Sequence, residues 1–360
     1  MIATDATTLA GDATPIGLAK ADTGFLDLLD RSGAALVGTF APGIVGCFGA
    51  HGGELNQVFT HLPGCFGVSH QEGRLAISTR REIGIFTLSR RLAPLYPGLP
   101  GQFDGMFLLT GTLTTGPCAI HDLVIDGPDV VFVNTLYSCV ARASLSHSFV
   151  PLWRPDFISA VLPEDRCHLN SFALDGTQLR YVTAFAASDA SRGYRDLPVD
   201  RGLLLEVETG RVVLDGLIRP HGARLFHGAL HVLNSGKGEV LRVDPITGAA
   251  QVLASLPGFT RGCFGLGDAL LVGLSKTRDT AIGLNLPVAC AQLDAVTIVA
   301  IDHTSGAEIG RLKLPPEVTE VLDFTLVPNL RSAVLHPPDS ESIPVELPEV
   351  SLWTTLTDPA

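Results

Sequence analysis

The chain has 360 residues, of which 46% are hydrophobic and 17% charged, and it contains 38 glycines and 24 prolines. This composition excludes disorder as the main state and favours short buried strands joined by tight turns over helices. The formal net charge is −12 at pH 7 and no basic patch is visible, which argues against DNA or RNA as a partner.

Residues 1–33, which include FLDLLDRSG, are expected to form a short helix or an arm outside the main domain. They contain no basic stretch followed by an apolar one, and the chain has no uninterrupted apolar run long enough to cross a bilayer. The sequence therefore predicts neither secretion nor a membrane span, and we expect a cytoplasmic protein. Seven cysteines without a CxxC pair fit neither a disulfide framework nor a zinc ribbon.

The remainder, residues 34–360, repeats one unit made of a short apolar run, a Gly/Asp turn and a second apolar run. Each unit predicts two strands joined by a tight turn, because Gly and Asp adopt the dihedrals that such turns need. In chain order the copies are GCFGVSHQEGRLAIST from Gly64, IHDLVIDGPDVVFVNT from Ile120, CHLNSFALDGTQLRYVT from Cys167, PHGARLFHGALHVLNS from Pro220, RGCFGLGDALLVGLS from Arg261 and LDFTLVPNLRSAVL from Leu322.

Further strand-like pieces lie between the copies, such as GLLLEVETGRVVLDG and GEVLRVDPITGAAQVLA, and each contains its own hairpin turn. Four strands per unit at a period of about 40–50 residues are typical of propeller blades. The sequence therefore predicts an all-β fold, a single six-bladed β-propeller with four-stranded blades. The early strands ALVGTF and GIVGCFG are expected to complete the last blade and close the ring. A solenoid of the same strands is the alternative.

Equivalent positions at the starts of the innermost strands form a ring around one mouth of a propeller channel. Aligning the turns of the copies brings polar residues to that mouth: His121, His168, His221, Arg261 and Asp323. Three neutral imidazoles from separate strands would suit a divalent metal ion, with Zn, Fe, Mn, Cu and Ca not distinguished, and would leave a position open for water or substrate. Arg261 would neutralise an anionic group, and Asp323 or Asp122 would act as a base or orient a ligand.

The leading interpretation is a metal-dependent lyase or hydrolase that acts on a small anionic metabolite in the channel. One alternative is a binding or scaffold propeller that recognises a peptide or protein, in which the histidines only hydrate the channel. Another is a metal-free catalyst, in which a histidine moves a proton and Arg261 stabilises an anion. The oligomeric state stays open.

Several residues are expected to contact the substrate, namely Asn134, Asn170, Asn234 and Lys276. Asn134 and Asn234 end the second strand of their copies, and Lys276 follows the corresponding position in GLSK. Small polar residues at strand ends also have a simpler explanation, because they terminate strands and begin turns.

The run HSFVPLWRPDFIS followed by PEDRCHLNSFAL, and then PHGARL, NSGKGEVLRVDP, LPGFTRG and VGLSK, resembles a bacterial family of propeller-like proteins labelled as conserved hypothetical. The resemblance covers roughly residues 60–330. It implies the same His121, His168, His221 and Arg261 positions. The architecture is also similar to six-bladed lactonases, strictosidine-synthase-like proteins and propeller lyases, although a shared fold does not decide function.

Overall fold

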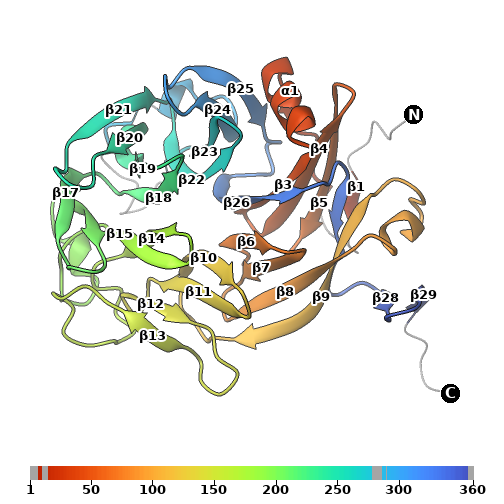
Figure 1. Cartoon of the computed structure of the whole chain (residues 1–360), viewed down its shortest axis with the longest axis horizontal. Helices are drawn as coiled ribbons and strands as arrows, with labels where there is room; N and C mark the ends of the chain where they lie inside the picture. Colours follow the sequence, from red (N-terminus) through yellow and green to blue (C-terminus); the bar gives the residue numbers. More distant parts are fainter. Residues whose placement is uncertain (1–6, 10–14, 278–285, 289, 356–360) are drawn as a thin grey trace.

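The computed structural model describes residues 7–9, 15–277, 286–288 and 290–355. Six small sheets are arranged around a central axis, and one strand of each sheet lies nearest to that axis (Figure 1). The predicted all-β, six-bladed β-propeller is therefore confirmed. Within the described residues, no helix is long and apolar enough to span a membrane.

The blades are numbered from the first complete copy of the repeat, and their strands are given from the axis outward. Blade 1 contains β6 (Val68–Gln71), β7 (Arg74–Ser78), β8 (Glu82–Ser89) and β9 (Gly105–Thr114), and blade 2 contains β10 (Ile120–Asp126), β11 (Asp129–Asn134), β12 (Cys139–Arg142) and β13 (Val150–Trp153). Blade 3 contains β14 (Leu169–Asp175), β15 (Gln178–Ala184), β16 (Gly202–Glu206) and β17 (Val212–Leu217).

Blades 4–6 follow the same plan. Blade 4 contains β18 (His221–Phe226), β19 (Ala229–Asn234), β20 (Glu239–Val243) and β21 (Ala250–Ser255), and blade 5 contains β22 (Phe259–Leu266), β23 (Ala269–Ser275), β24 (Thr297–Asp302) and β25 (Glu308–Lys313). Blade 6 contains β26 (Glu320–Pro328), β3 (Ala34–Ala41), β4 (Ile44–His51) and β5 (Glu54–His61). The outer edges of blades 1, 5 and 6 carry β27 (Ala333–Leu335), β2 (Lys20–Ala21) and β1 (Thr7–Leu9).

Strands from opposite ends of the chain close the ring. β26 pairs antiparallel with β3, so the N-terminal strands supply the outer three strands of blade 6, as the sequence predicts. The sixth copy of the repeat does not form the expected hairpin, however. Its second strand, β27, pairs in parallel with β9 of blade 1. The reason is that β3 already occupies the edge of β26 that a hairpin strand would need.

The helix α1 (Thr23–Ser32) forms within the segment for which the sequence predicts a short helix or an arm. The carboxylate of Asp22 caps it by accepting a hydrogen bond from the backbone N–H of Phe25 at 2.9 Å, and Gly33 ends it in the left-handed conformation. Phe25 and Leu29 are buried in the same core cluster as strands of blades 5 and 6. The division of the chain at residue 33 into an arm and a propeller domain stays a prediction.

The remaining elements lie in the connections and near the C-terminus. β28 (Ser342–Glu346) and β29 (Ser351–Thr355) form a two-stranded sheet outside the six blades (Figure 1). The short 3-10 helices are η1 (Ala93–Leu95), η2 (Gly193–Arg195), η3 (Ser235–Lys237) and η4 (Cys290–Gln292). All seven cysteines are free thiols, and six of them are buried as small apolar side chains.

The innermost strands of blades 1–5 can be compared by counting back from the two-residue turn that follows each of them. In each innermost strand we take the last residue that pairs with the second strand of the blade and count back five residues. In blades 1 to 5 this gives Phe66, His121, Asn170, His221 and Arg261, respectively. We call this place the axial position. The sequence alignment assigns it to His168 in blade 3, which is two residues too early. His168 has a positive φ of 49°, as do Ala119 (51°) and Arg219 (51°), which precede His121 and His221 by two residues.

A register shift lies at or directly after the axial position in β10, β14, β18 and β22. In β18 and β22 the next residue is a glycine with positive φ, Gly222 (55°) and Gly262 (72°). A Cβ at Gly222 would lie 2.7 Å from Cδ1 of Leu233, and a Cβ at Gly262 would lie 2.8 Å from Cε1 of Phe324. Only glycine fits these two bulges. Each bulge changes the direction in which the side chains on either side of it point.

Candidate functional site

Seven side chains lie around the end of the channel where the innermost strands begin, and six contacts join them in series. We call them the axial ring: Phe66, His121, His168, Phe185, His221, Phe259 and Arg261. In this order the ring centroids of successive members are 4.7, 5.0, 4.3, 5.6 and 5.3 Å apart, and the guanidinium carbon of Arg261 lies 4.6 Å from the centroid of Phe66. The structure thus brings together the three histidines and the arginine singled out from the sequence, with phenylalanines between them.

His121 and His221 have matching surroundings. Nδ1 of His121 lies 2.8 Å from the carbonyl oxygen of Ala119 and 2.9 Å from the hydroxyl of Thr135. Nδ1 of His221 lies 2.9 Å from the carbonyl oxygen of Arg219 and 3.0 Å from the hydroxyl of Ser235. A carbonyl oxygen only accepts, so each Nδ1 carries a proton, and in the neutral ring Nε2 holds the lone pair. Burial, followed by the charges of His168 and Arg261, lowers the pKa of His121 well below its usual value and keeps it neutral.

His168 differs from the other two histidines because a carboxylate holds it. Its Nδ1 lies 2.9 Å from Oδ2 and 3.0 Å from Oδ1 of Asp165. The hydroxyl of Tyr194 donates to the same carboxylate at 3.0 Å, and Nε of Arg195 donates to that hydroxyl at 3.1 Å. His168 and Asp165 are both buried. The carboxylate fixes the tautomer with the proton on Nδ1, which makes Nε2 the basic atom.

Arg219 is a buried guanidinium beside the ring. It is 3% exposed, and its Nε and Nη1 have no hydrogen-bond partner among the described residues. Its guanidinium carbon lies 4.9 Å from the centroid of Phe185 and 5.6 Å from that of Tyr194, the two rings that also contact His168. Burial lowers the pKa of Arg219. A buried cation with two unused donors is a suitable site for an anionic group.

Arg261 is held by an aromatic face and a carboxylate. It stacks over Phe66, and its Nη1 lies 3.7 Å from Oε2 of Glu320. Both charged side chains are largely buried. Arg261 therefore places positive charge at the mouth, as its predicted role requires, while part of that charge is balanced by Glu320.

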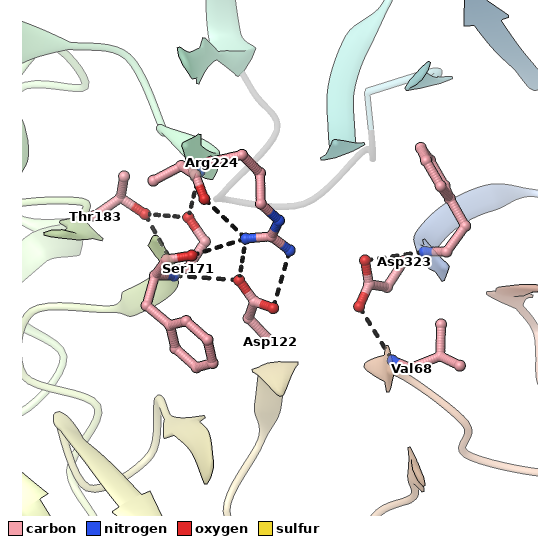
Figure 2. Close-up of polar contacts among 9 residues, drawn as sticks. Val68, Asp122, Ser171, Thr183, Arg224 and Asp323 are labelled. Carbon is pink, nitrogen blue, oxygen red and sulfur yellow. Dashed lines mark hydrogen bonds and ion pairs between the residues drawn. The ribbon is translucent and has the colours of Figure 1, made fainter. Parts of the chain in front are cut away.

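Asp122 belongs to a second polar layer, one step farther along the innermost strands (Figure 2). Nη1 and Nη2 of Arg224 donate to Oδ2 and Oδ1 of Asp122 at 2.7 and 3.0 Å, and the backbone N–H of Phe172 donates to Oδ2 at 3.2 Å. Nη1 of Arg224 also donates to the carbonyl oxygens of Phe172 and Ala223. This two-pronged ion pair engages both carboxylate oxygens of Asp122, so the structure gives this residue a partner in the channel wall and does not place it in the axial ring as a base.

Asp323 lies across the channel from this ion pair (Figure 2), and it is not a member of the axial ring. Its Oδ2 accepts from the backbone N–H of Val68 at 3.1 Å, and its Oδ1 accepts from its neighbour Phe324 at 2.9 Å. Burial, followed by the charge of Asp122, raises the pKa of Asp323 to about 7, although Arg224 and the two N–H groups oppose the shift. A cavity of about 190 Å³ adjoins this layer, lined partly by Asp122 and Arg224.

The residues predicted to contact a substrate have different surroundings. Asn134 donates to Sγ of Cys118 at 3.3 Å and accepts from the backbone N–H of Tyr137 at 3.2 Å. Asn234 accepts from the backbone N–H of Ile218 at 2.7 Å and donates to Glu239 at 2.8 Å. Both amides are thus engaged in holding turns.

Asn170 and Lys276 complete the predicted contact set. Asn170 is at the axial position of blade 3, and its buried Nδ2 has no partner among the described residues. Lys276 is exposed and lines an open surface pocket with Thr277, Asp294 and Glu320. Asn170 is therefore the member of the set with a buried, unused donor, and Lys276 is not part of the axial ring.

The three axial histidines do not form a compact ligand set. In the described part of the chain, the one group of three His, Cys, Asp or Glu residues whose ligand atoms all lie within 4.8 Å of one another is His227, Asp268 and His303, at the opposite end of the channel. Phe185 contacts both His168 and His221. A single ion bound by His121, His168 and His221 would require the imidazoles to approach one another.

Asp165, Tyr194 and Arg219 are parts of the site that sequence reasoning missed. Asp165 lies three residues before His168, a spacing that could have signalled a carboxylate–histidine pair. Arg219 lies two residues before His221, in the same RPH segment. Tyr194 lies in the long connection between β15 and β16, where no repeat alignment reaches.

Replacing Asp323 by Asn tests the pKa in the second polar layer. The folded protein binds a proton at Asp323 up to about pH 7, whereas the unfolded chain loses it near 3.8. Between these values the folded state holds more protons, so ionisation opposes folding and stability falls as pH rises, by at most about 1.4 kcal/mol per pH unit. In urea unfolding from pH 5 to 8, the free energy of unfolding of Asp323→Asn should increase relative to that of the wild type as pH rises.

The Asn side chain also leaves one backbone N–H, of Val68 or of Phe324, without its acceptor, because the amide nitrogen only donates. This adds a cost that does not depend on pH. The diagnostic quantity is therefore the change of the stability difference with pH. Asp175→Asn, at the exposed end of β14, is the matched control. Parallel curves for the wild type and Asp323→Asn would show that Asp323 is ionised throughout this range.

The model of a family described as a domain of unknown function (DUF4915) matches residues 23–335. None of the curated proteins compared matches the chain in sequence. A chain in the crystal structure of a nidogen/laminin complex is 14% identical, with a TM-score of 0.53, over 82% of this chain and 99% of that one. At this identity the likeness concerns the fold alone.

Two further solved structures are similar at lower TM-scores. A protein of unknown function from Bacteroides caccae is 12% identical, with a TM-score of 0.47, over 82% of this chain and 98% of that one. The WD40 domain of Neurospora crassa Pan2 is 15% identical, with a TM-score of 0.40, over 77% and 71% of the two chains. The resemblance to lactonases and strictosidine-synthase-like proteins stays a prediction. Because the family model extends from the start of α1 to the end of β27, the chain belongs to the DUF4915 family.

Proposed function

We propose that the protein is an enzyme that acts on a small anionic metabolite at the axial ring, with His168 as its acid–base residue. The observation that carries this proposal is the contact between Asp165 and His168. A buried carboxylate 2.9 Å from Nδ1 orients the imidazole and stabilises the cation that forms when Nε2 takes a proton. No described residue occupies Nε2 of His168 with a hydrogen bond, so this atom is available to a substrate.

Arg219 supplies the complementary group for an anion. Its Nε and Nη1 are buried without partners, and it contacts the same two aromatic rings as His168. A carboxylate or phosphate bound there would complete these hydrogen bonds and offset the cost of burying the charge. Asn170, with its unused Nδ2, would donate a further hydrogen bond.

This arrangement supports lyase or hydrolase chemistry. Nε2 of His168 would take a proton either from a carbon next to the bound anion or from an attacking water, and the imidazolium would return it to the leaving group. Arg219 and Arg261 would stabilise the negative charge that develops on the substrate in between. Asp323, with a pKa of about 7, is a second group able to exchange a proton near neutral pH.

A second candidate keeps His121, His168 and His221 as ligands of a divalent metal ion. The observation that favours it is that each Nδ1 donates to an oxygen atom, the arrangement that orients metal-binding histidines. Against it, the ligand atoms of the three residues do not lie within 4.8 Å of one another. The imidazoles do not fit one ion as they stand, and no catalytic step is derived through a metal.

Arg219→Met tests the anion site without requiring a known substrate. Methionine fills similar space without a charge and removes a buried group that lacks hydrogen-bond partners. Without ligand, the free energy of unfolding of the variant should therefore equal that of the wild type or exceed it by up to ~3 kcal/mol. Malonate or inorganic phosphate should raise the melting temperature of the wild type but not that of the variant. Arg180→Met, at a more exposed ion pair, is the control. An unchanged anion response in Arg219→Met would remove this residue from the site.

His168→Gln and Asp165→Asn test the acid–base assignment. In a screen of small carboxylate and phosphate esters, lactones and hydroxy acids, any turnover by the wild type should be lost in His168→Gln. Asp165→Asn should lower kcat by about 10²–10⁴-fold with little change in KM, because it disturbs the tautomer and not the anion contact. His147→Ala, on an exposed loop, is the control.

Full turnover in His168→Gln would contradict the assignment. Anion binding through Arg219 without any turnover in the screen would instead favour a propeller that binds a ligand without transforming it.

Elemental analysis of protein purified without a histidine tag tests whether His121, His168 and His221 bind a metal ion. Replacement of His121, His168 and His221 by alanine should leave the metal content unchanged if the acid–base proposal holds. Loss of one equivalent of metal in this triple variant, with the fold intact by circular dichroism, would make the axial histidines ligands and move the chemistry to a bound ion.

A further inference from the structure

His227, Asp268 and His303 come together on the face of the propeller opposite the axial ring. They lie in the turns β18–β19, β22–β23 and β24–β25, so two neighbouring blades contribute. β18 and β22 begin at the axial ring, and these turns follow their far ends. The ligand atoms of the three residues lie within 4.8 Å of one another. From this geometry we propose a Zn²⁺ site, which we call the far-face site and which is independent of the proposed function.

The chemistry of the three donors selects the ion. Two imidazoles and one carboxylate suit Zn²⁺ or another late first-row ion, whereas Mg²⁺ and Ca²⁺ prefer oxygen donors throughout. Three protein ligands on an exposed surface leave a fourth position for water. The site therefore belongs to the open type, in contrast to closed structural sites with four protein ligands.

Hydrogen bonds already orient the first imidazole. Nε2 of His227 lies 2.8 Å from the carbonyl oxygen of Gly267, which only accepts, so Nε2 carries the proton. Nε2 also lies 3.8 Å from Oδ1 of Asp268, so the nitrogen that approaches the carboxylate is the protonated one. Zn²⁺ bound between these two residues would displace the proton on Nε2 and its hydrogen bond to Gly267, because a metal-binding imidazole must present a lone pair.

The other two ligands are tied together through the backbone. The N–H of His303 donates to the carbonyl oxygen of Asp268 at 3.0 Å, which fixes the two turns of blade 5 relative to each other. Oδ1 of Asp302 accepts from the N–H groups of Thr304 (3.1 Å) and Ser305 (2.7 Å) and holds the turn that carries His303. These hydrogen bonds thus hold the backbone of Asp268 and His303 in place before any ion binds.

The two imidazoles lie side by side against an apolar wall. Their ring centroids are 4.7 Å apart with an interplanar angle of 30°, and Phe226 contacts both, at 4.2 and 5.6 Å. His227 and its neighbour Gly228 both have positive φ, 48° and 72°, which sets the tight turn that presents the imidazole. An ion held here would connect blade 4 to blade 5.

Isothermal titration of tag-free protein with ZnCl₂ tests the site. The wild type should bind one equivalent of Zn²⁺ here, and MgCl₂ at the same concentrations should give no saturable heat. His303→Ala should lose this equivalent, and Asp268→Asn, which preserves the turn, should weaken binding at least about tenfold. His147→Ala, another exposed histidine, should bind as the wild type does.

Two further measurements keep this result separate from the axial ring and from misfolding. The triple alanine variant of His121, His168 and His221 should retain the far-face equivalent. Co²⁺ should give a visible d–d band in the wild type and in that variant but not in His303→Ala, while circular dichroism shows all three folded. Zn²⁺ binding of unchanged stoichiometry and affinity in the double variant His227→Ala/His303→Ala would overturn the proposal.

Discussion

The pairing of β26 with β3 is the interaction on which the rest of the molecule depends. It joins residues such as Thr39 and Asp323, which are 284 positions apart in the sequence, at a cost in chain entropy of about 5 kcal/mol. Burial of large side chains at this junction, such as Phe40 and Phe324, offsets that cost, at about 2–3 kcal/mol each. The hydroxyl of Thr39 also donates to the carbonyl oxygen of Phe66, so the closing strand holds the backbone of a residue that contributes to the axial ring.

Much of this architecture could be predicted from the sequence, because turns and apolar runs are local signals. Counting the strands in each repeat gives the blades. The final copy of the repeat is not followed by strands for the outer part of its blade, so the early strands near Phe40 are its natural partners. The same local signals failed in two places. β27 pairs with blade 1 through a long-range contact. In blade 3 the axial residue is Asn170, five positions before Asp175, and His168 occupies the place that Ala119 and Arg219 have in blades 2 and 4.

The site was harder to predict than the ring that holds it. An alignment of repeats finds only residues that recur, and it therefore found His121, His221 and Arg261. Asp165 and Tyr194 support a single histidine in a single blade, so no repeat signal marks them. Burial also changes what a residue can do. Asp122 and Asp323 look alike in sequence, yet Arg224 neutralises the first, whereas the second lies buried without a cation of its own.

The net charge of the protein limits how an anion could be attracted to the axial ring and held there. A net charge of −12 gives no long-range attraction to a small anion, so steering cannot supply the affinity. Short-range contacts must do so, and these are strongest where water is excluded and the effective dielectric constant is low. Arg219 meets this condition because it is buried against Phe185 and Tyr194 with two donors unused. At the proposed anion site, selectivity would then follow from contact with one desolvated guanidinium, and an arginine exposed to solvent would not provide it.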